Sequence, residues 1–370
     1  MSAGGPNVRP GGAAPGGPAG PAAAASASTG TPAEGRRVAV LGAGDMGGRH
    51  ASHWAAAGAQ VVVVADADAE RAAALAEAYG AEASGDPTEA AARVDVDVVS
   101  VCLPTFLHAG VTVAALEGGA DVLSEKPVAL TLRDAEAMGA AARATGRTVR
   151  IGFMRRFDPL WRRVEQDAAH LGTPVMAQAT LAAGVRPKLL MHDAYANGGP
   201  VIDMACHLFD RWERVFGTPP LRVRASGHTF AAGKAEVAAI EHVALDTVQV
   251  DLDYGEAGSA QLQLSWGLPA GVPATERHAY VGPEGVLDVD EDGATLRQGP
   301  DATTYAASDV DPWREEIFAF ARELAGDGPQ GVADLAAGVR ALRASLAVLE
   351  AVRTGGAVDP AMLQPEAEVA

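Results

Sequence analysis

Uninterrupted apolar runs alternate with amphipathic segments through residues 36–152. Apolar runs without polar alternation are typical of strands in a parallel sheet that is buried on both faces. The strand-like runs and the helix-like segments between them lie at residues 37–41, 46–57, 61–65, 69–79, 96–102, 108–117, 121–124, 132–145 and 148–152. This order predicts a doubly wound parallel α/β domain over residues 35–152, with ligands beyond the carboxyl ends of its strands.

After residue 152, apolar and polar residues alternate within the strand-like segments. Strands are expected at residues 175–182, 243–254, 259–266 and 277–281. Helices are expected from about residue 159, after Gly198-Gly199-Pro200, and at residues 313–324 and 335–352. Strand-rich sequence with turn signals such as Tyr254-Gly255 predicts a second α/β domain over residues 153–355, with an open, mostly antiparallel sheet.

Both ends of the chain differ from the rest. Residues 1–34 are mostly Gly, Pro, Ala and Ser, so they cannot bury enough apolar surface to offset the entropy of ordering. We therefore expect a disordered leader at residues 1–34 and a flexible tail at residues 356–370. The leader lacks the basic start and continuous apolar centre of a signal peptide.

Charge and cysteine content narrow the classes of partner. The chain carries 47 acidic and 29 basic residues, a net charge of −18, which would repel nucleic acid and anionic membranes. No segment is long and apolar enough to span a membrane. The two cysteines, Cys102 and Cys206, each lie in an apolar run, which indicates a reducing, cytoplasmic setting without disulfides. We therefore expect small molecules or other copies of this chain as partners.

A glycine-rich turn follows the first strand. Gly42, Gly44 and Gly47 form a G-x-G-x-x-G pattern, with Asp45 and Met46 between the last two glycines. These glycines allow a tight turn, close approach of a pyrophosphate and close packing of the next helix, whose positive end faces the anion. The pattern predicts a dinucleotide site.

Asp66 closes the second strand, 61–65, at the position expected for a ribose-binding carboxylate. Such a carboxylate accepts hydrogen bonds from the ribose hydroxyls and repels a 2′-phosphate. No arginine follows immediately, so NAD is favoured over NADP. The alternative is that Asp66 only caps the helix at residues 69–79.

Lys126 lies in the sequence Glu125-Lys126-Pro127, at the end of the strand-like run 121–124. Pro127 favours extended geometry at Lys126, which could hold the ammonium near the nicotinamide. A lysine that is partly desolvated or beside a cationic ring has a lowered pKa, which suits proton exchange with a hydroxyl. The alternative is a surface lysine in a turn.

Three titratable residues lie on one face of the helix predicted after Gly198-Gly199-Pro200. Asp203, His207 and Asp210 are spaced four and three apart, among apolar neighbours. Buried polar groups need partners, so this spacing predicts a site or a network. A core histidine with capping aspartates is the alternative. A metal site is disfavoured because no cysteine or second histidine lies at metal-ligand spacing.

The order of these motifs gives a specific resemblance. Together with Cys102-Leu103-Pro104-Thr105, His108 and the run Gly152-Phe153-Met154-Arg155-Arg156-Phe157-Asp158-Pro159, they resemble the glucose-fructose oxidoreductase/inositol 2-dehydrogenase/rhizopine catabolism (Gfo/Idh/MocA) family. The resemblance covers residues 36–352. It implies an NAD-binding Rossmann domain and a second domain whose open sheet assembles a homodimer or homotetramer.

The resemblance also implies roles for individual residues. The catalytic residues it implies are Lys126, Asp203 and His207, and the same three with Asp210 would bind substrate. The cofactor-binding residues are Gly42, Gly44, Asp45, Met46, Gly47, Asp66, Pro104, Thr105, His108, Glu125, Lys126 and Arg155. No metal is implied. Surface or interdomain ion pairs are the alternative role for Arg155 and Arg156.

These roles predict an NAD-dependent dehydrogenase that transfers a hydride from a ring hydroxyl carbon of a cyclitol or sugar-like polyol. We expect His207 to act as the base, Lys126 to polarise the oxygen and Asp203 to orient His207. An NAD-retaining glycoside hydrolase and a non-catalytic NAD and sugar sensor are the alternatives.

The stretch 265–273 departs from inositol dehydrogenases, in which a polar, tyrosine-containing stretch lies near the active site, and puts inositol itself in doubt. Lys188 and His192, in the stretch 186–193, are candidate specificity contacts at the substrate mouth, and the favoured alternative is that both only build the loop.

Overall fold

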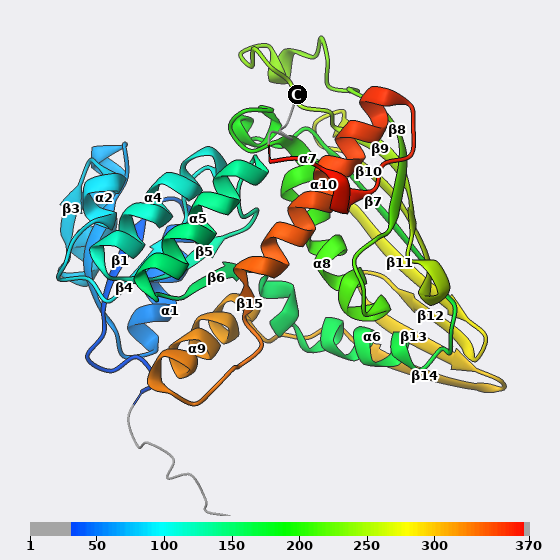
Figure 1. Cartoon of the computed structure of the whole chain (residues 1–370), viewed down its shortest axis with the longest axis horizontal. Helices are drawn as coiled ribbons and strands as arrows, with labels where there is room; N and C mark the ends of the chain where they lie inside the picture. Colours follow the sequence, from blue (N-terminus) through cyan, green and yellow to red (C-terminus); the bar gives the residue numbers. More distant parts are fainter. Residues whose placement is uncertain (1–30, 366–370) are drawn as a thin grey trace, which may run out of the picture. The chain divides into compact units, whose positions relative to one another are not determined.

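The computed structural model describes residues 31–365, which form two sheets with flanking helices (Figure 1). The leader predicted at 1–34 lies outside the described residues except for residues 31–34, where Ala33 is buried and its N–H bonds the carbonyl of Ala57. Of the predicted tail, residues 366–370 lie outside the description. The rest is docked, since Val358 pairs with Val223 and Arg343 Nη1 donates to the Leu363 carbonyl.

The first sheet, sheet A, has the strand order β15-β6-β5-β4-β1-β2-β3. Its strands are β1 (Arg37–Leu41), β2 (Gln60–Ala65), β3 (Glu82–Ser84), β4 (Val98–Val101), β5 (Asp121–Glu125), β6 (Val149–Gly152) and β15 (Ala333–Asp334). All of the recorded strand pairs in it are parallel except β15 with β6. Its helices are α1 (Asp45–Ala56), α2 (Ala69–Tyr79), α3 (Pro87–Ala91), α4 (Thr105–Gly118) and α5 (Leu132–Thr145). The predicted doubly wound sheet is confirmed.

The uninterrupted apolar runs form the centre of sheet A. All four residues of β4 are buried, as are Val61 to Ala65 of β2. Such strands have no polar face to turn to water, so helices must cover both sides. The strand ends are therefore the places where polar side chains of sheet A can meet a ligand.

The second sheet, sheet B, has the strand order β14-β13-β12-β11-β7-β10-β9-β8. Its strands are β7 (Val175–Gly184), β8 (Arg222–His228), β9 (Thr247–Asp253), β10 (Gly258–Leu268), β11 (Thr275–Gly282), β12 (Gly285–Val289), β13 (Gly293–Gln298) and β14 (Asp301–Ala306). Its pairs are antiparallel except β7 with β10, which confirms the mostly antiparallel sheet. The sequence prediction lacked β8, β12, β13 and β14.

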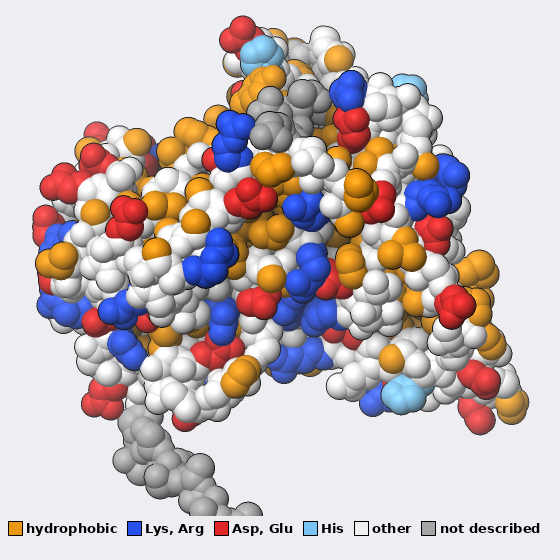
Figure 2. Space-filling view, viewed as in Figure 1, with side chains coloured by type: hydrophobic (Ala, Val, Ile, Leu, Met, Phe, Trp, Pro, Cys, Tyr) orange, Lys and Arg blue, Asp and Glu red, His pale blue; other side chains and the backbone are white. Residues whose placement is uncertain are grey.

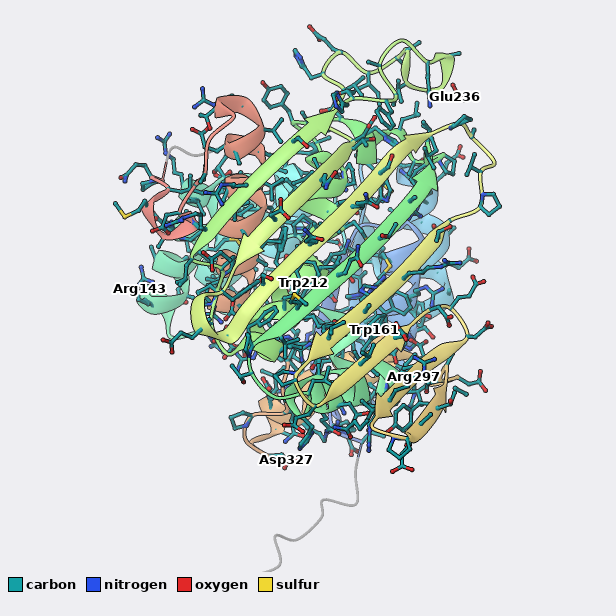
Figure 3. The ribbon with its side chains drawn as sticks, turned by 90° about the vertical axis from the view of Figure 1, so that its right-hand side faces the viewer. Arg143, Trp161, Trp212, Glu236, Arg297 and Asp327 are labelled. Atoms are coloured by element: carbon teal, nitrogen blue, oxygen red, sulfur yellow. The ribbon has the colours of Figure 1, made fainter. Side chains whose placement is uncertain are left out.

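Helices lie against one face of sheet B (Figure 1). The helices of this half are α6 (Pro159–Ala169), α7 (Gly199–Asp203), α8 (Ala205–Phe216), α9 (Pro312–Ala325) and α10 (Leu335–Thr354), with short 3₁₀ turns η1 (Met154–Phe157), η2 (Leu189–His192), η3 (Ala235–Val237), η4 (Gly255–Ala257) and η5 (Pro360–Met362). Burial alternates along β9, so one side faces these helices. Figure 3 views the other face, over which no helix of residues 31–365 is drawn.

The segment from α9 to β15 returns to sheet A. Ala333 pairs with Ile151, and Phe320 of α9 packs edge to face on Trp54 of α1 at 6.1 Å between ring centroids. The sequence prediction placed this segment in the second domain, over 153–355. The difference has a physical reason: α9 covers the apolar side of α1, and this pairing depends on tertiary contact rather than on any local pattern.

Candidate active site

The glycine-rich turn joins β1 to α1 as the sequence predicts. Gly42 has φ +98°, and a Cβ there would lie 2.4 Å from the Cys102 carbonyl oxygen. A Cβ on Gly47 would lie 1.7 Å from the Gly42 oxygen, so the turn and helix can pack only with glycine at both positions. A Cβ on Gly44 would meet nothing within 4 Å, which leaves its backbone open to a ligand. Asp45 begins α1 just beyond it.

Asp66 lies beside this turn, at the end of β2. Its carboxylate accepts hydrogen bonds from Ala43 N and from Asp68 N, each at 2.8 Å. The helix cap is Asp68, whose Oδ1 accepts from the amides of Glu70 and Arg71, so capping does not account for Asp66. Arg71 Nη2 also lies 3.3 Å from Asp66 Oδ1, a contact that the sequence analysis did not foresee because Arg71 is one helical turn further on.

The loop after β4 supplies Pro104, and the first turn of α4 supplies Thr105 and His108. Pro104 precedes the first turn of α4, and Thr105 is 2% exposed. The ring nitrogens of His108 contact the carbonyl oxygens of Leu103 and Pro127, each at 2.8 Å. His108 therefore braces the loop after β4 against the loop after β5.

Lys126 lies on that second loop, where its peptide bond to Pro127 is cis. Its Nζ donates to Oδ1 and to the carbonyl oxygen of Asp203, both at 3.0 Å. Burial alone would lower the pKa of Lys126, but nearby negative groups, chiefly Asp203, outweigh it and raise that pKa. The pKa of Lys126 is therefore raised in this structure, opposite to the lowering that the sequence analysis expected.

Asp203 and His207 lie on two short helices rather than on one. Asp203 ends α7 and His207 lies in α8, with the break at Met204. The Asp203 carboxylate faces Lys126, and no hydrogen bond from Asp203 to His207 is found among the described residues. Asp203 therefore positions Lys126, whereas the sequence analysis expected it to orient His207.

His207 is 5% exposed and packs edge to face on Phe153, with 5.7 Å between ring centroids. Its Nδ1 is buried without a hydrogen-bond partner in residues 31–365. Burial, followed by the charges of Lys126, Arg155 and Arg211, holds the pKa of His207 well below its ordinary value. A histidine in this setting is neutral near pH 7 and can accept a proton.

Asp210 and Arg155 are engaged elsewhere. Arg156 Nε donates to Asp210 Oδ2 at 2.9 Å, and Asp210 is 5% exposed. Arg155 Nη2 donates to Glu276 Oε2 of β11 at 3.0 Å. The structure thus brings Lys126, Asp203 and His207 together, while Asp210 belongs to a separate ion pair.

A buried network behind Lys126 was missed by the sequence analysis. The His50 ring contacts Ser100 Oγ at 2.7 Å and Glu125 Oε1 at 3.2 Å, and Trp54 Nε1 donates to the same Ser100 Oγ at 3.1 Å. Glu125 Oε2 accepts from the Lys126 amide at 3.2 Å, which ties the network to the loop that carries Lys126. The sequence signal that could have revealed this network is His50, which lies on the buried face of α1, three residues after Gly47.

Side chains of the stretch 186–193 contact their own loop and the glycine turn. His192 Nε2 accepts from the Arg186 amide at 2.8 Å, and Arg186 stacks over Trp266 at 4.8 Å, so these side chains build the loop itself. Lys188 Nζ lies 2.6 Å from Asp45 Oδ2, beside the glycine turn.

No cluster that could hold a metal ion is found within residues 31–365, and no helix described there is long and apolar enough to cross a membrane. Acidic and basic side chains are interspersed over the face in Figure 2.

The residues that could hold a dinucleotide are the glycine turn, Asp66 and the loops after β4 and β5.

Comparisons with known proteins agree with this arrangement. Residues 36–153 match "Oxidoreductase family, NAD-binding Rossmann fold", and residues 165–287 match "GFO/IDH/MocA C-terminal domain". Scyllo-inositol 2-dehydrogenase (NAD(+)) of Bacillus subtilis (strain 168) is 31% identical over 61% of this chain and 66% of its own length. D-glucoside 3-dehydrogenase of Escherichia coli (strain K12) is 35% identical over 52% of this chain and 57% of its own length.

The chain therefore spans somewhat less than two thirds of these curated relatives. Among solved structures, UDP-N-acetylglucosamine 3-dehydrogenase of Acidithiobacillus ferrooxidans superposes with a TM-score of 0.72 at 27% identity, covering 86% of this chain and 98% of that one.

Proposed function

Because this chain belongs to the Gfo/Idh/MocA oxidoreductase family, we propose that it is an NAD-dependent dehydrogenase that oxidises a ring hydroxyl of a cyclitol or sugar-like polyol. The observation that carries the proposal is the meeting of Lys126, Asp203 and neutral His207 at the strand ends that also present the glycine turn. The relatives named above act on an inositol, a glucoside and a nucleotide sugar, all of which carry ring hydroxyls.

NAD would be held by the open backbone at Gly44 and by the Asp66 carboxylate, and would supply the hydride acceptor. The protein's own work is to move one proton and to hold the reacting oxygen. His207, which its lowered pKa keeps neutral near pH 7, takes the hydroxyl proton. Lys126 donates a hydrogen bond to the same oxygen as negative charge develops on it.

Asp203 keeps the Lys126 side chain charged and holds its ammonium in a fixed position through two hydrogen bonds. Its carboxylate lies 3.0 Å from Nζ and is largely buried, so solvent screens the pair weakly. This arrangement gives the three residues separate duties: His207 accepts the proton, Lys126 stabilises the oxygen and Asp203 positions Lys126.

The test is reduction of NAD by a panel of inositols, glucosides, aldoses and nucleotide sugars, followed by nicotinamide absorbance, with NADP in parallel. One polyol class should reduce NAD, and His207→Gln should bind NAD without reducing it. NADP should react poorly because Asp66 repels a 2′-phosphate.

Two other outcomes would redirect the proposal. Cleavage of a glycoside with NAD retained and no net reduction would indicate the hydrolytic alternative. Binding of NAD and sugar with neither reaction would indicate a sensor. The presence of a complete proton-transfer set favours the dehydrogenase over both.

We also propose a cytoplasmic homodimer or homotetramer. The two free cysteines support a reducing location, and the face of sheet B shown in Figure 3, over which no helix of residues 31–365 is drawn, is available to a second copy. Light scattering on the purified full chain would give the assembly size, and a monomer at working concentration would contradict the proposal.

A further inference from the structure

One segment of the second domain, residues 186–197, contacts the first residues of two helices of sheet A, α1 and α4. At its start, Lys188 Nζ lies 2.6 Å from Asp45 Oδ2, although the two residues are 143 positions apart. At its end, the Thr105 amide donates to Asn197 Oδ1 at 3.0 Å. Asp45 follows β1 and Thr105 follows β4, so the segment runs from one strand end to the other.

Those two strands define the place where a dinucleotide binds. β1 and β4 are paired parallel neighbours, and β2 lies on the other side of β1, so the strand order reverses between β1 and β4. Ligands of doubly wound sheets bind at this reversal, with the pyrophosphate on the first glycine turn. The segment 186–197 therefore extends over the position of the pyrophosphate.

Two negative groups would meet at this position, the Asp45 carboxylate and a bound pyrophosphate, and a cation is needed to offset their repulsion. Asp45 stands at the start of α1, one residue after the open backbone of Gly44, and its carboxylate would repel a pyrophosphate. The hydrogen bond and charge of Lys188 lower the pKa of Asp45, so this carboxylate is ionised near neutral pH. An ammonium has three donors, and a single contact to Asp45 leaves others for a phosphate oxygen.

The exposure of the pair argues against a role in folding. Lys188 is 62% exposed and Asp45 78%, and ion pairs this open to water add little to stability. The backbone below Lys188 is nevertheless fixed, since His192 Nε2 accepts from the Arg186 amide and the His192 carbonyl accepts from Ala244 N. A flexible side chain on a fixed base can move onto a ligand without rearranging the loop.

We propose that Lys188 is a cofactor-binding residue supplied by the second domain, whose ammonium is shared between Asp45 and a pyrophosphate oxygen of the bound dinucleotide. This rests on the proposed use of NAD. It assigns the segment 186–197 to cofactor retention rather than to substrate selection, and it predicts slow release of the dinucleotide.

The test compares ligand binding to the full chain and to Lys188→Met by titration calorimetry. NAD and ADP-ribose, which carry the pyrophosphate, should bind Lys188→Met about tenfold more weakly, with a faster release rate. Adenosine, which lacks phosphate, should bind both proteins equally. Lys234→Met is the matched control, since Lys234 contacts the Gly267 carbonyl instead, and it should bind all three ligands as the unchanged chain does.

The double variant Asp45→Asn/Lys188→Met separates a phosphate contact from simple neutralisation of Asp45. If Lys188 touches the pyrophosphate, the double variant should stay weaker than the single variant Asp45→Asn. Equal affinity of these two would overturn the direct contact.

Unchanged NAD affinity and release in Lys188→Met would overturn the proposal as a whole. Equal weakening of adenosine and NAD would overturn it too, because it would indicate a disturbed loop. Failure of the unchanged chain to bind NAD at all would instead contradict the proposed function.

Discussion

Two lysine–aspartate contacts join sheet A to the second domain, and they differ in burial. Lys126 and Asp203 meet at 3.0 Å with 19% and 7% of their side chains exposed. Lys188 and Asp45 meet at 2.6 Å with 62% and 78% exposed. The shorter contact is the weaker one, because water and salt screen exposed charges far more than buried ones. Burial, rather than distance, decides what each contact can do.

The buried contact fixes one geometry, whereas the exposed one can exchange partners. Asp203 gives Lys126 two acceptors at the same distance, its carboxylate and its carbonyl oxygen, so the ammonium is held in place before any ligand arrives. Lys188 has one recorded acceptor and is otherwise free to meet a ligand. The comparison predicts large catalytic effects at the first contact and modest binding effects at the second.

Removing the ammonium of the buried contact should have the largest effect. Lys126→Ala should lower kcat by about 100- to 10,000-fold, because the developing charge on the substrate oxygen loses its donor. The dissociation constant of NAD should change little. Steady-state kinetics and NAD titration check this, and full turnover in the variant would refute the assigned role.

Removing the carboxylate of the buried contact should have the next largest effect. Asp203→Asn should lower kcat by about tenfold or more. Because Asp203 is the leading group that raises the pKa of Lys126, the alkaline limb of the pH–rate profile should move to lower pH. Asp45→Asn serves as the control, since it removes the exposed carboxylate and should leave that limb in place.

Acid should lower the stability of the fold through His278, a buried residue of β11 that belongs to neither contact. Burial leads the causes that lower the pKa of His278 to about 4, so the folded state binds its proton less readily than the unfolded chain does. Stability should therefore fall as pH drops below about 6.5, by about 2 kcal/mol at pH 5 from this group. Denaturant unfolding at pH 7 and pH 5 measures the loss, and His278→Gln should reduce it.

Neutralising the exposed contact should have the smallest effect on the fold. Lys188→Met should shift Tm by less than about 2 °C, because a screened surface pair contributes little to stability. Thermal unfolding without ligand is the measurement. A large drop would mean that the exposed pair holds the domains together, and the contrast between the two contacts would disappear.

The sequence predicted what local patterns encode. The run Val61 to Ala65 identified a buried strand, and the glycine spacing identified the turn at Gly42 and Gly47, because both depend on neighbours in the chain. Short hairpin strands such as β12 and β13 were missed because each is only five or six residues long and begins at a glycine, which by itself indicates a turn.

The site was predicted in part for the same reason. Lys126, Asp203 and His207 were found from local motifs, yet the bond from Lys126 to Asp203 joins residues 77 positions apart, so the sequence could not show which group Asp203 faces. Lys188 and Asp45 are 143 positions apart, so local sequence patterns could not predict their contact either. The raised pKa of Lys126 follows from that unseen partner.

The pairing of β15 with β6 determines how the chain can be divided. A fragment that stops at residue 152 would leave β6 as an unpaired edge and strip α9 from Trp54 of α1. Open edges and bared apolar surface promote aggregation between copies. The NAD-binding domain is thus discontinuous in the chain, and a soluble minimal version would need α9 and β15 joined back to residue 152 by a linker that replaces the second domain.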